Sequence, residues 1–231
     1  MVTQAVGNGE SHEGAGNDMS GLRDQQKKKR REAILAASAG LFGKQGYAAT
    51  SMEEIATAAE LSVGTLYNYF KSKGDITLAL YRADLEMVRK ASEAVILEPS
   101  VDPVKAIIKL MEADLNTTPD YLDGNAWQEL LVAAFTSPSS SMAVEWEGGD
   151  LMRVDLFSRL LGALQERGHI GEQADIRSVA EVLGALSLTY FMHWLVNLKA
   201  GRIDQDSCPI AGPTKRMLTR QVKQLVAGMV A

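Results

Sequence analysis

The chain has 231 residues, of which 46% are hydrophobic and 23% are charged. This composition provides enough apolar side chains for one or two packed domains and excludes the disordered and fibrous classes of protein. Its formal net charge of −5 argues against generic binding to polyanions. The single cysteine, Cys208, cannot form an internal disulfide, so we expect a reducing, cytoplasmic environment.

Charge is distributed unevenly along the chain. Residues 22–75 contain nine Lys or Arg and six Asp or Glu, which gives +3 and leaves −8 for the rest. Such asymmetry is expected when a nucleic-acid-binding end is attached to an acidic body. Residues 1–22 are rich in glycine and polar residues and lack the apolar core of a secretory signal, so we expect a disordered tail there.

Helical periodicity runs through the remaining sequence, and no sustained alternation of β-branched and polar residues indicates a strand. We therefore predict an all-α protein. The first helix covers about 24–45 and ends at Gly46. A second helix begins at Ser51, which forms an S-x-x-E capping box with Glu54, and it ends near residue 60.

A third, short helix has Ser62 as its N-cap and ends near residue 70 or 71, and Ser72 caps a long fourth helix near 72–95. Breaks at 99–103, 117–119, 137–141, 168–171 and 201–213 divide the rest into about five further helices. The predicted organisation is a tail at 1–22, a helix-turn-helix DNA-binding domain at 23–72, and a larger helical ligand-binding and dimerisation domain at 73–231.

The second and third helices have the proportions of a helix-turn-helix, whose second member enters the DNA major groove with its N-terminus first. Leu66 and Phe70 are four residues apart and would point into the three-helix core. The groups nearest the bases would be Val63, Gly64, Thr65 and Asn68. Gly64 would let the backbone approach the groove, and the hydroxyl and methyl of Thr65 can meet base edges.

Hydroxyl and ammonium groups flank this third helix and suit phosphate oxygens, because they position a protein on DNA without reading its sequence. These are Ser51, Ser62, Tyr67, Tyr69 and Lys73. The alternative is that the tyrosines are half-buried packing residues and the lysines a solvated face. In the basic run 27–31, Lys28 and Arg30 are the candidates for phosphate or minor-groove contact. Basic residues early in a helix oppose its macrodipole, so helix stability does not account for them and a polyanion partner would. A solvated tail is the alternative.

Residues 33–78 resemble the N-terminal domain of the TetR family of bacterial transcriptional regulators. The matching elements, at the family's spacing, are Leu41-Phe42, Gly46-Tyr47, Thr50-Ser51, Ile55-Ala56, Ser62 to Tyr67, Phe70 and Lys73. Two positions depart from the family pattern. Glu60 stands in a turn that often has glycine, so a left-handed backbone there would carry a steric cost. Tyr69 stands where histidine is frequent, which keeps an aromatic hydrogen-bonding group.

Residues 179–198 are apolar on every face, with a few polar interruptions. A transmembrane span is one reading, but the polar positions favour a helix that packs on its own domain and on a second subunit. Gly184 and Ser187 would allow close helix approach, and Pro213 opens a final amphipathic helix. These helices predict a homodimer with a four-helix interface, which resembles the family's arrangement and implies a palindromic DNA operator.

Between the DNA-binding domain and this interface, aromatic residues and methionines recur at helical spacing, which usually indicates core. The family resemblance adds the expectation of a pocket for a small, largely apolar effector. Candidate lining residues are Met111, Trp127, Leu131, Phe135, Trp146, Tyr190, His193 and Asn197. Trp127, Tyr190, His193 and Asn197 could supply the polar contacts.

We expect no enzyme and no cofactor or metal site, because the sequence has three histidines, no glycine-rich phosphate loop and no His, Cys and Asp set at metal-ligand spacing. Residues and resemblance together predict a dimeric repressor of transcription that an effector releases from double-stranded operator DNA. The alternative is a ligand-independent DNA-architectural or scaffold protein with a solid C-terminal core.

Overall fold

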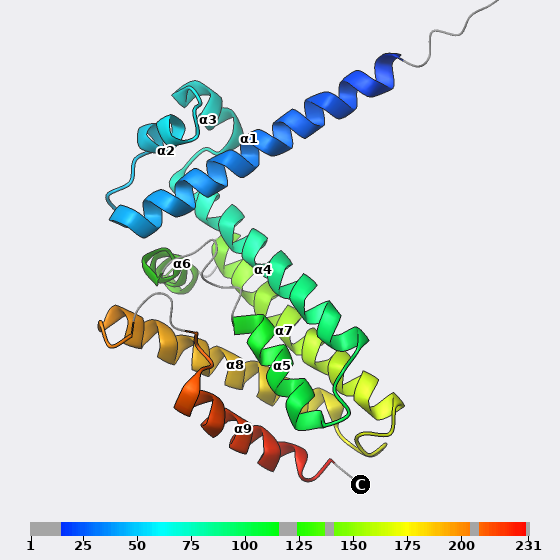
Figure 1. Cartoon of the computed structure of the whole chain (residues 1–231). Coiled ribbons are helices and arrows are strands. Elements are labelled where there is room, and N and C mark those ends of the chain that lie inside the picture. The colour runs from blue at the N-terminus through cyan, green and yellow to red at the C-terminus, as the bar shows by residue number, and fades with distance from the viewer. Residues whose placement is uncertain (1–14, 116–123, 137–140, 204–207, 230–231) are drawn as a thin grey trace, which may run out of the picture.

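The structure is a computed structural model, and it describes residues 15–115, 124–136, 141–203 and 208–229. All regular structure in these ranges is helical, which confirms the predicted all-α class (Figure 1). The helices are α1 (Ala15–Gln45), α2 (Met52–Ala58), α3 (Val63–Tyr69), α4 (Lys73–Leu97), α5 (Pro103–Leu115), α6 (Gly124–Thr136), α7 (Ser141–Glu166), α8 (Ile176–Lys199) and α9 (Gly212–Val226). In Figure 1, α1–α3 form a small N-terminal unit at the start of α4, and α4–α9 form a larger C-terminal unit.

Helix α1 begins at Ala15 rather than near residue 24, so residues 15–22 of the predicted tail are helical and that prediction was wrong. The side chains of residues 21–33 are exposed, so α1 runs beyond the part of it that packs in the N-terminal unit. Extending an existing helix orders one residue for each added hydrogen bond, whereas starting a helix requires a costly nucleus. A helix can therefore continue through a segment without apolar periodicity. Residues 1–14 of the predicted tail lie outside the described residues.

The N-terminal unit has an apolar core built from four helices. Ile34 and Phe42 from α1, Ile55 from α2, Leu66 from α3 and Ile76 from α4 are all buried. Because α2 and α3 have seven residues each, neither buries enough surface to be stable alone. The long helices α1 and α4 therefore hold the two short ones in place.

Helix α4 belongs to both units. Ser72 is its N-cap, as predicted, and its hydroxyl accepts a 3.2 Å hydrogen bond from the backbone N–H of Asp75. Ile76 and Leu80 are fully buried near the start of α4, and the rest of the helix packs against α5 and α7. The first turns of α4 thus complete the N-terminal core, whereas the predicted domain boundary would assign all of α4 to the C-terminal domain.

Helix α8 packs mainly against α7 of the same chain. A Cβ added at Gly184 would lie 3.3 Å from Val154 Cγ2, and Ser187 is fully buried. These small residues therefore serve close packing within one chain, rather than between subunits as the sequence suggested. Within the part of the chain that the structure describes, α8 is the one helix long and apolar enough to cross a membrane, but 44% of its most apolar stretch is buried in the fold.

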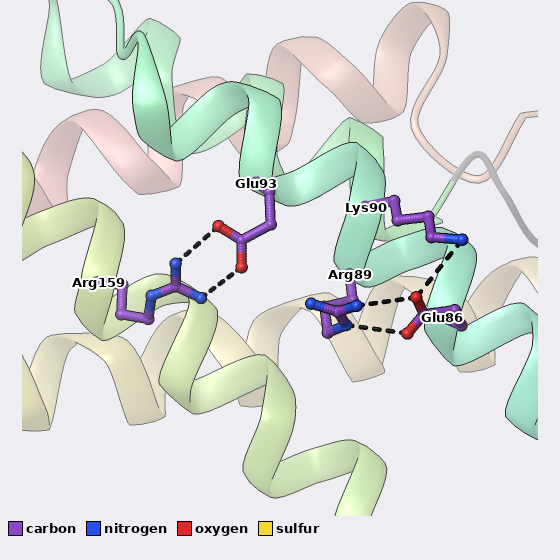
Figure 2. A network of polar contacts seen from close by, with 5 residues as sticks. All are labelled: Glu86, Arg89, Lys90, Glu93 and Arg159. Atoms are coloured by element: carbon purple, nitrogen blue, oxygen red, sulfur yellow. Dashed lines mark hydrogen bonds and ion pairs between the residues drawn. The ribbon is translucent and has the colours of Figure 1, made fainter. Parts of the chain in front are cut away.

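Two arginines join α7 to neighbouring helices. Arg159 donates two 2.7 Å hydrogen bonds to the carboxylate of Glu93 on α4 (Figure 2), and these bonds lower the pKa of the Glu93 carboxyl. Arg153 Nε lies 3.0 Å from Asp114 Oδ1 on α5, and both of these side chains are largely buried. A partly exposed pair contributes little to stability, whereas losing one partner of a buried pair leaves an uncompensated charge. The Arg153 pair is therefore the stronger constraint.

Tyr81 of α4 is fully buried, and its hydroxyl lies against Gly149 of α7. A Cβ at position 149 would overlap that hydroxyl. The Tyr81 ring is also held between Trp127 and Trp146, with ring centroids at 5.7 Å and 6.2 Å. Burial raises the pKa of the Tyr81 phenol above its ordinary value. Glycine at 149 therefore allows α4 and α7 to approach with a tyrosine between them.

Replacement of the two adjacent glycines of α7 should have opposite effects on stability. Gly149→Ala should lower the free energy of unfolding by about 1–3 kcal/mol, because it overpacks the Tyr81 site. Gly148→Ala, where a Cβ would meet nothing within 4 Å, should raise it by up to about 1 kcal/mol through helix propensity. Urea unfolding of both variants measures the difference. Equal effects, or a Gly149→Ala cost that persists in a Tyr81→Phe background, would contradict the proposed contact.

Candidate nucleic-acid interface and ligand-binding region

Helix α3 presents one face to the core and the other to solvent. Leu66 and Phe70, the residues predicted to point inward, are buried. On the rest of the α3 surface, Gly64, Tyr67 and Asn68 are exposed and Thr65 is partly exposed, while Val63 and Tyr69 are partly buried against the core. A Cβ at Gly64 would meet nothing within 4 Å, so the packing of this chain does not require glycine there. The bare backbone at Gly64 is therefore available for close approach to a partner.

The N-cap residue of α3, Ser62, is hydrogen-bonded to Thr65 in the first turn of the helix. Ser62 is the N-cap, as predicted, and its hydroxyl accepts a 3.1 Å bond from the backbone N–H of Thr65. The hydroxyls of Ser62 and Thr65 are themselves 2.8 Å apart and hydrogen-bonded. Capping fixes the orientation of both side chains at the end of the helix that would enter a DNA groove first.

Ser51, a predicted phosphate contact, is held within its own helix start. Its hydroxyl accepts from Glu54 N–H at 3.1 Å and lies 3.0 Å from Glu54 Oε2, and its N–H donates to the same carboxylate at 2.7 Å. The predicted capping box is thus confirmed. These bonds from the Ser51 N–H and hydroxyl lower the pKa of the Glu54 carboxyl. The Ser51 hydroxyl proton is committed to Glu54, so a phosphate would have to compete for it.

Lys73 joins the start of α4 to the segment between α1 and α2. Its Nζ donates a 2.7 Å hydrogen bond to the carbonyl of Tyr47 and lies 4.5 Å from the centre of the Tyr47 ring. A carbonyl acceptor and an aromatic face both favour an ammonium group. The side chain therefore fixes the tertiary arrangement of the N-terminal unit in addition to the phosphate contact predicted for it.

A groove of about 390 Å³ separates α1 from α3. Its walls carry basic side chains of α1 and two predicted contacts on α3: Lys27, Lys28, Arg31, Asn68 and Tyr69, together with Asp24. Of the two α1 residues chosen from sequence, Lys28 lines the groove, while Arg30 is exposed and does not. Lys27 and Arg31 were missed, although they are four residues apart and therefore lie on one face of the helix. The Arg31 guanidinium also lies 4.8 Å above the centre of the Phe70 ring.

The turn between α2 and α3 has a left-handed residue at Glu60. Its φ of 56° is the only positive φ at a non-glycine residue in the described ranges. The N–H of Glu60 donates to Thr57 O at 3.1 Å and that of Leu61 to Ala56 O at 2.9 Å. This pair of bonds is a Schellman motif, which usually has glycine at the left-handed position. The steric cost predicted for Glu60 is therefore present.

The predicted ligand-binding residues separate into two groups. Met111, Trp127, Leu131 and Trp146 are buried in the core of the C-terminal unit, whereas Phe135 is 66% exposed. The rings of Trp127 and Trp146 contact each other at 6.5 Å. The indole N–H of Trp127 and the Tyr81 hydroxyl have no hydrogen-bond partner among the residues that the structure describes. The four buried residues of this first group therefore belong to the hydrophobic core of the chain.

The second group lines an open cavity. Tyr190, His193 and Asn197 project from α8 into a space of about 410 Å³ whose other walls include Trp194 and Met217. The structure thus brings together the three polar residues chosen on α8 and separates them from the first group. Among the described residues, no group of three His, Cys, Asp or Glu side chains could hold a metal ion.

Known proteins share the sequence of the N-terminal unit and the fold of most of the chain. Residues 34–80 match the family described as bacterial regulatory proteins, tetR family. The chain is 26% identical over 176 residues to the HTH-type transcriptional repressor KstR of Rhodococcus jostii strain RHA1, covering 75% of this chain and 76% of that protein. The fold is similar to a TetR transcription regulator from Haloarcula marismortui, with a TM-score of 0.65, 16% identity, and coverage of 88% and 100%. The ketosteroid transcriptional regulator KstR2 of Mycobacterium tuberculosis gives a TM-score of 0.52, 18% identity, and coverage of 87% and 95%.

Replacement of Glu60 tests the cost of the left-handed turn. Glu60→Gly should raise the free energy of unfolding by about 0.5–1 kcal/mol, because the relief of backbone strain exceeds the added flexibility of the unfolded chain. The matched control is Glu98→Gly at an exposed residue with a φ of −128°, where only the entropic cost applies and stability should fall. Thermal unfolding of both variants decides, and a loss of stability in Glu60→Gly equal to that of the control would contradict the assignment.

Proposed function

We propose that this chain, which belongs to the TetR family of bacterial transcriptional regulators, acts in the cytoplasm as a dimeric repressor. Members of this family are DNA-binding proteins and not enzymes. A small, largely apolar effector would release the dimer from a palindromic operator. The observation that carries the DNA-binding part is the basic groove between α1 and α3, which adjoins the exposed face of the capped recognition helix. Phosphate-binding and base-reading groups thereby occupy one continuous surface.

Different residues of this surface would read bases and contact phosphates. Val63, Gly64, Thr65 and Asn68 on the exposed face of α3 would read base edges in the major groove, since this is the end of the helix that enters first. Lys27, Lys28 and Arg31 in the groove, with Tyr67 and Tyr69, would contact phosphates and set the register. Lys73 and Ser51 would add to phosphate binding from positions that local hydrogen bonds already fix.

A second copy of the chain would bind the outer face of α8 and the adjoining part of α9. Val182, Val196 and Met217 are 50%, 57% and 47% exposed on these helices, and Thr189 and His193 are exposed between the two valines. Apolar side chains at this spacing on a helix that is otherwise packed into the domain suit an isologous interface. Two-fold symmetry would place the recognition helices about 34–36 Å apart, one turn of DNA.

Release of the operator would proceed through α4 and α6. Helix α4 contributes to the cores of both units, and α6 packs against α1. An effector that favours one arrangement of the C-terminal unit would therefore displace the DNA-binding unit. A coupling free energy of about 1–3 kcal/mol is enough to lower operator affinity up to roughly a hundredfold.

A ligand-independent DNA-binding protein is the second candidate. The observation in its favour is the burial of four predicted ligand-binding residues in the hydrophobic core, namely Met111, Trp127, Leu131 and Trp146. Effector-dependent release of the operator distinguishes the two functions.

Removal of a groove cation should weaken binding to all DNA sequences. Lys28→Ala should reduce affinity for operator and random DNA alike and lower the slope of log K against log salt by roughly 1.8 for the dimer, because each of its two subunits loses one phosphate contact that contributes about 0.9. Arg30→Ala removes the same charge from outside the groove and should change the slope less. Fluorescence anisotropy at several salt concentrations measures both slopes. Identical slopes for the two variants would show that the groove has no special role.

Removal of a base-reading group should instead reduce discrimination. Thr65→Ala should narrow the difference in binding free energy between operator and random DNA by about 1–3 kcal/mol, because its hydroxyl and methyl face the bases. Tyr67→Phe, which removes a hydroxyl assigned to phosphate, should weaken both complexes equally. Competition titrations on the two DNAs provide the measurement. An undiminished difference in Thr65→Ala would exclude Thr65 from sequence reading.

A further inference from the structure

The cavity of about 410 Å³ beside α8 has the size of a small-molecule site and is not lined by the first group of predicted ligand-binding residues. One wall is the C-terminal half of α8, with Tyr190, Trp194 and Asn197. The facing wall is formed by the segment before α9 and by its first turns, including Pro209 and Met217. The C-terminal half of α8, the described residues just before α9 and the first turns of α9 therefore border this cavity.

None of the described residues that line this cavity is Asp, Glu, Lys or Arg. An ion that entered would lose hydration without gaining an opposite charge from these lining residues, and the nearby Arg202 guanidinium is already bonded to Asn197 Oδ1. The lining instead combines apolar surface from Trp194, Pro209 and Met217 with the polar groups of Tyr190 and Asn197. This composition selects an uncharged, mainly apolar molecule with one or two hydrogen-bonding atoms.

The polar groups of the cavity are held in position before any ligand binds. The Tyr190 hydroxyl donates a 2.8 Å hydrogen bond to Gln221 Oε1 on α9, which joins the two walls. Asn197 Nδ2 donates to the His193 carbonyl at 2.8 Å, and its Oδ1 accepts from Arg202 at 3.2 Å. Asn197 Nδ2 has a second N–H that can donate to a ligand oxygen, whereas the single O–H of Tyr190 is committed to Gln221, so the Tyr190 oxygen is suited to accept from a ligand hydroxyl. Ordered polar groups reduce the entropic cost of binding, so both residues are suited to fix the orientation of a bound molecule.

Aromatic contacts connect this cavity to α4. Trp194 stacks on Phe191 at 5.9 Å, Phe191 contacts Trp127 at 4.8 Å, and Trp127 contacts Tyr81 of α4 at 5.7 Å. The four rings are packed in series, so displacement of Trp194 has to be accommodated by its neighbours. A ligand against Trp194 would thus act on the helix that α3 precedes directly in the chain.

We propose that the α8–α9 cavity binds an uncharged, mainly apolar ketone or alcohol, with its apolar body against Trp194 and its oxygen hydrogen-bonded to Tyr190 or Asn197. Taking this molecule to be the effector rests on the proposed function. The effector site is then the open cavity beside α9, and the buried rings of Phe191, Trp127 and Tyr81 transmit its effect to α4 without being the binding site.

The test uses two probes with one carbon skeleton, 2-decalone and decahydro-2-naphthoate, titrated into the full-length protein by calorimetry. The ketone should bind with a saturable isotherm, and the carboxylate at least about tenfold more weakly because its charge is uncompensated. Asn197→Leu should weaken ketone binding by about tenfold through loss of a hydrogen bond, and Tyr190→Phe should weaken it less, because the Tyr190 O–H is already donated to Gln221. Gln224→Leu, which removes an exposed amide of α9 outside the cavity, should leave it unchanged.

The site at which the ketone binds is tested by tryptophan fluorescence in a Trp127→Phe/Trp146→Phe protein, where Trp194 is the remaining tryptophan. A ketone-dependent change in its emission supports the cavity. Absence of ketone binding, equal affinity for the two probes, or affinity unaffected by both Asn197→Leu and Tyr190→Phe would overturn the proposal.

Operator affinity, measured separately by anisotropy with and without the ketone, distinguishes failure of the site from failure of the proposed function. Ketone binding that is sensitive to Asn197→Leu but leaves operator affinity unchanged supports the cavity and refutes its role as effector site. Operator release that persists in Asn197→Leu would place the effector site elsewhere and overturn the assignment made here.

Discussion

The continuity of α4 is the constraint on which the rest of the structure depends. Its first turns fill the N-terminal core with Ile76 and Leu80, and its remaining turns pack against α5 and α7. A helix of 25 residues without proline bends little, so its two ends cannot reorient independently. The fit of Tyr81 against Gly149 joins α4 to α7, and the buried Arg153–Asp114 pair joins α7 to α5. A change in how α5 and α7 pack against α4 would therefore also move the recognition helix α3.

The surface assigned to DNA is organised by local hydrogen bonds that exist without DNA. Ser51, Ser62 and Lys73 each bond to their own helix start or to a neighbouring carbonyl. These bonds fix side chains that would otherwise have to be ordered on binding, which lowers the entropic cost of association. Glu60, in contrast, destabilises this surface locally. Its left-handed backbone carries strain in the turn that sets the angle between α2 and α3.

Local features of this fold could be predicted from the sequence, since they depend on residues close together in the chain. The caps at Ser51, Ser62 and Ser72, the stop at Gly46 and the burial of Leu66 and Phe70 follow from spacing alone, and the structure contains them. The extension of α1 to Ala15 was missed because it has no apolar face. Its stability comes from propagation along a helix that is held elsewhere.

Tertiary neighbours were harder to predict. Gly184 and Ser187 indicate close helix packing but not which helix; the structure places Gly184 against Val154 of α7 and buries Ser187 within the same chain. Arg30 was chosen instead of Arg31 because the sequence does not show which face of α1 meets α3. The candidate ligand residues were identified as one set because sequence does not show whether apolar side chains lie in a core or line a cavity. The structure separates them into buried core residues and residues of a cavity beside α9.

The distance between the two DNA-binding units of a dimer tests the central claim most directly. A spin label at Lys44→Cys, an exposed position of α1, in a Cys208→Ser background would report this distance by pulsed dipolar spectroscopy. The account predicts a dipolar signal between subunits, a single narrow distribution when operator is bound, and a displaced distribution when 2-decalone is added without DNA. The absence of a dipolar signal, or distributions that are the same with and without ligand, would contradict the proposed coupling between the C-terminal unit and the recognition helices.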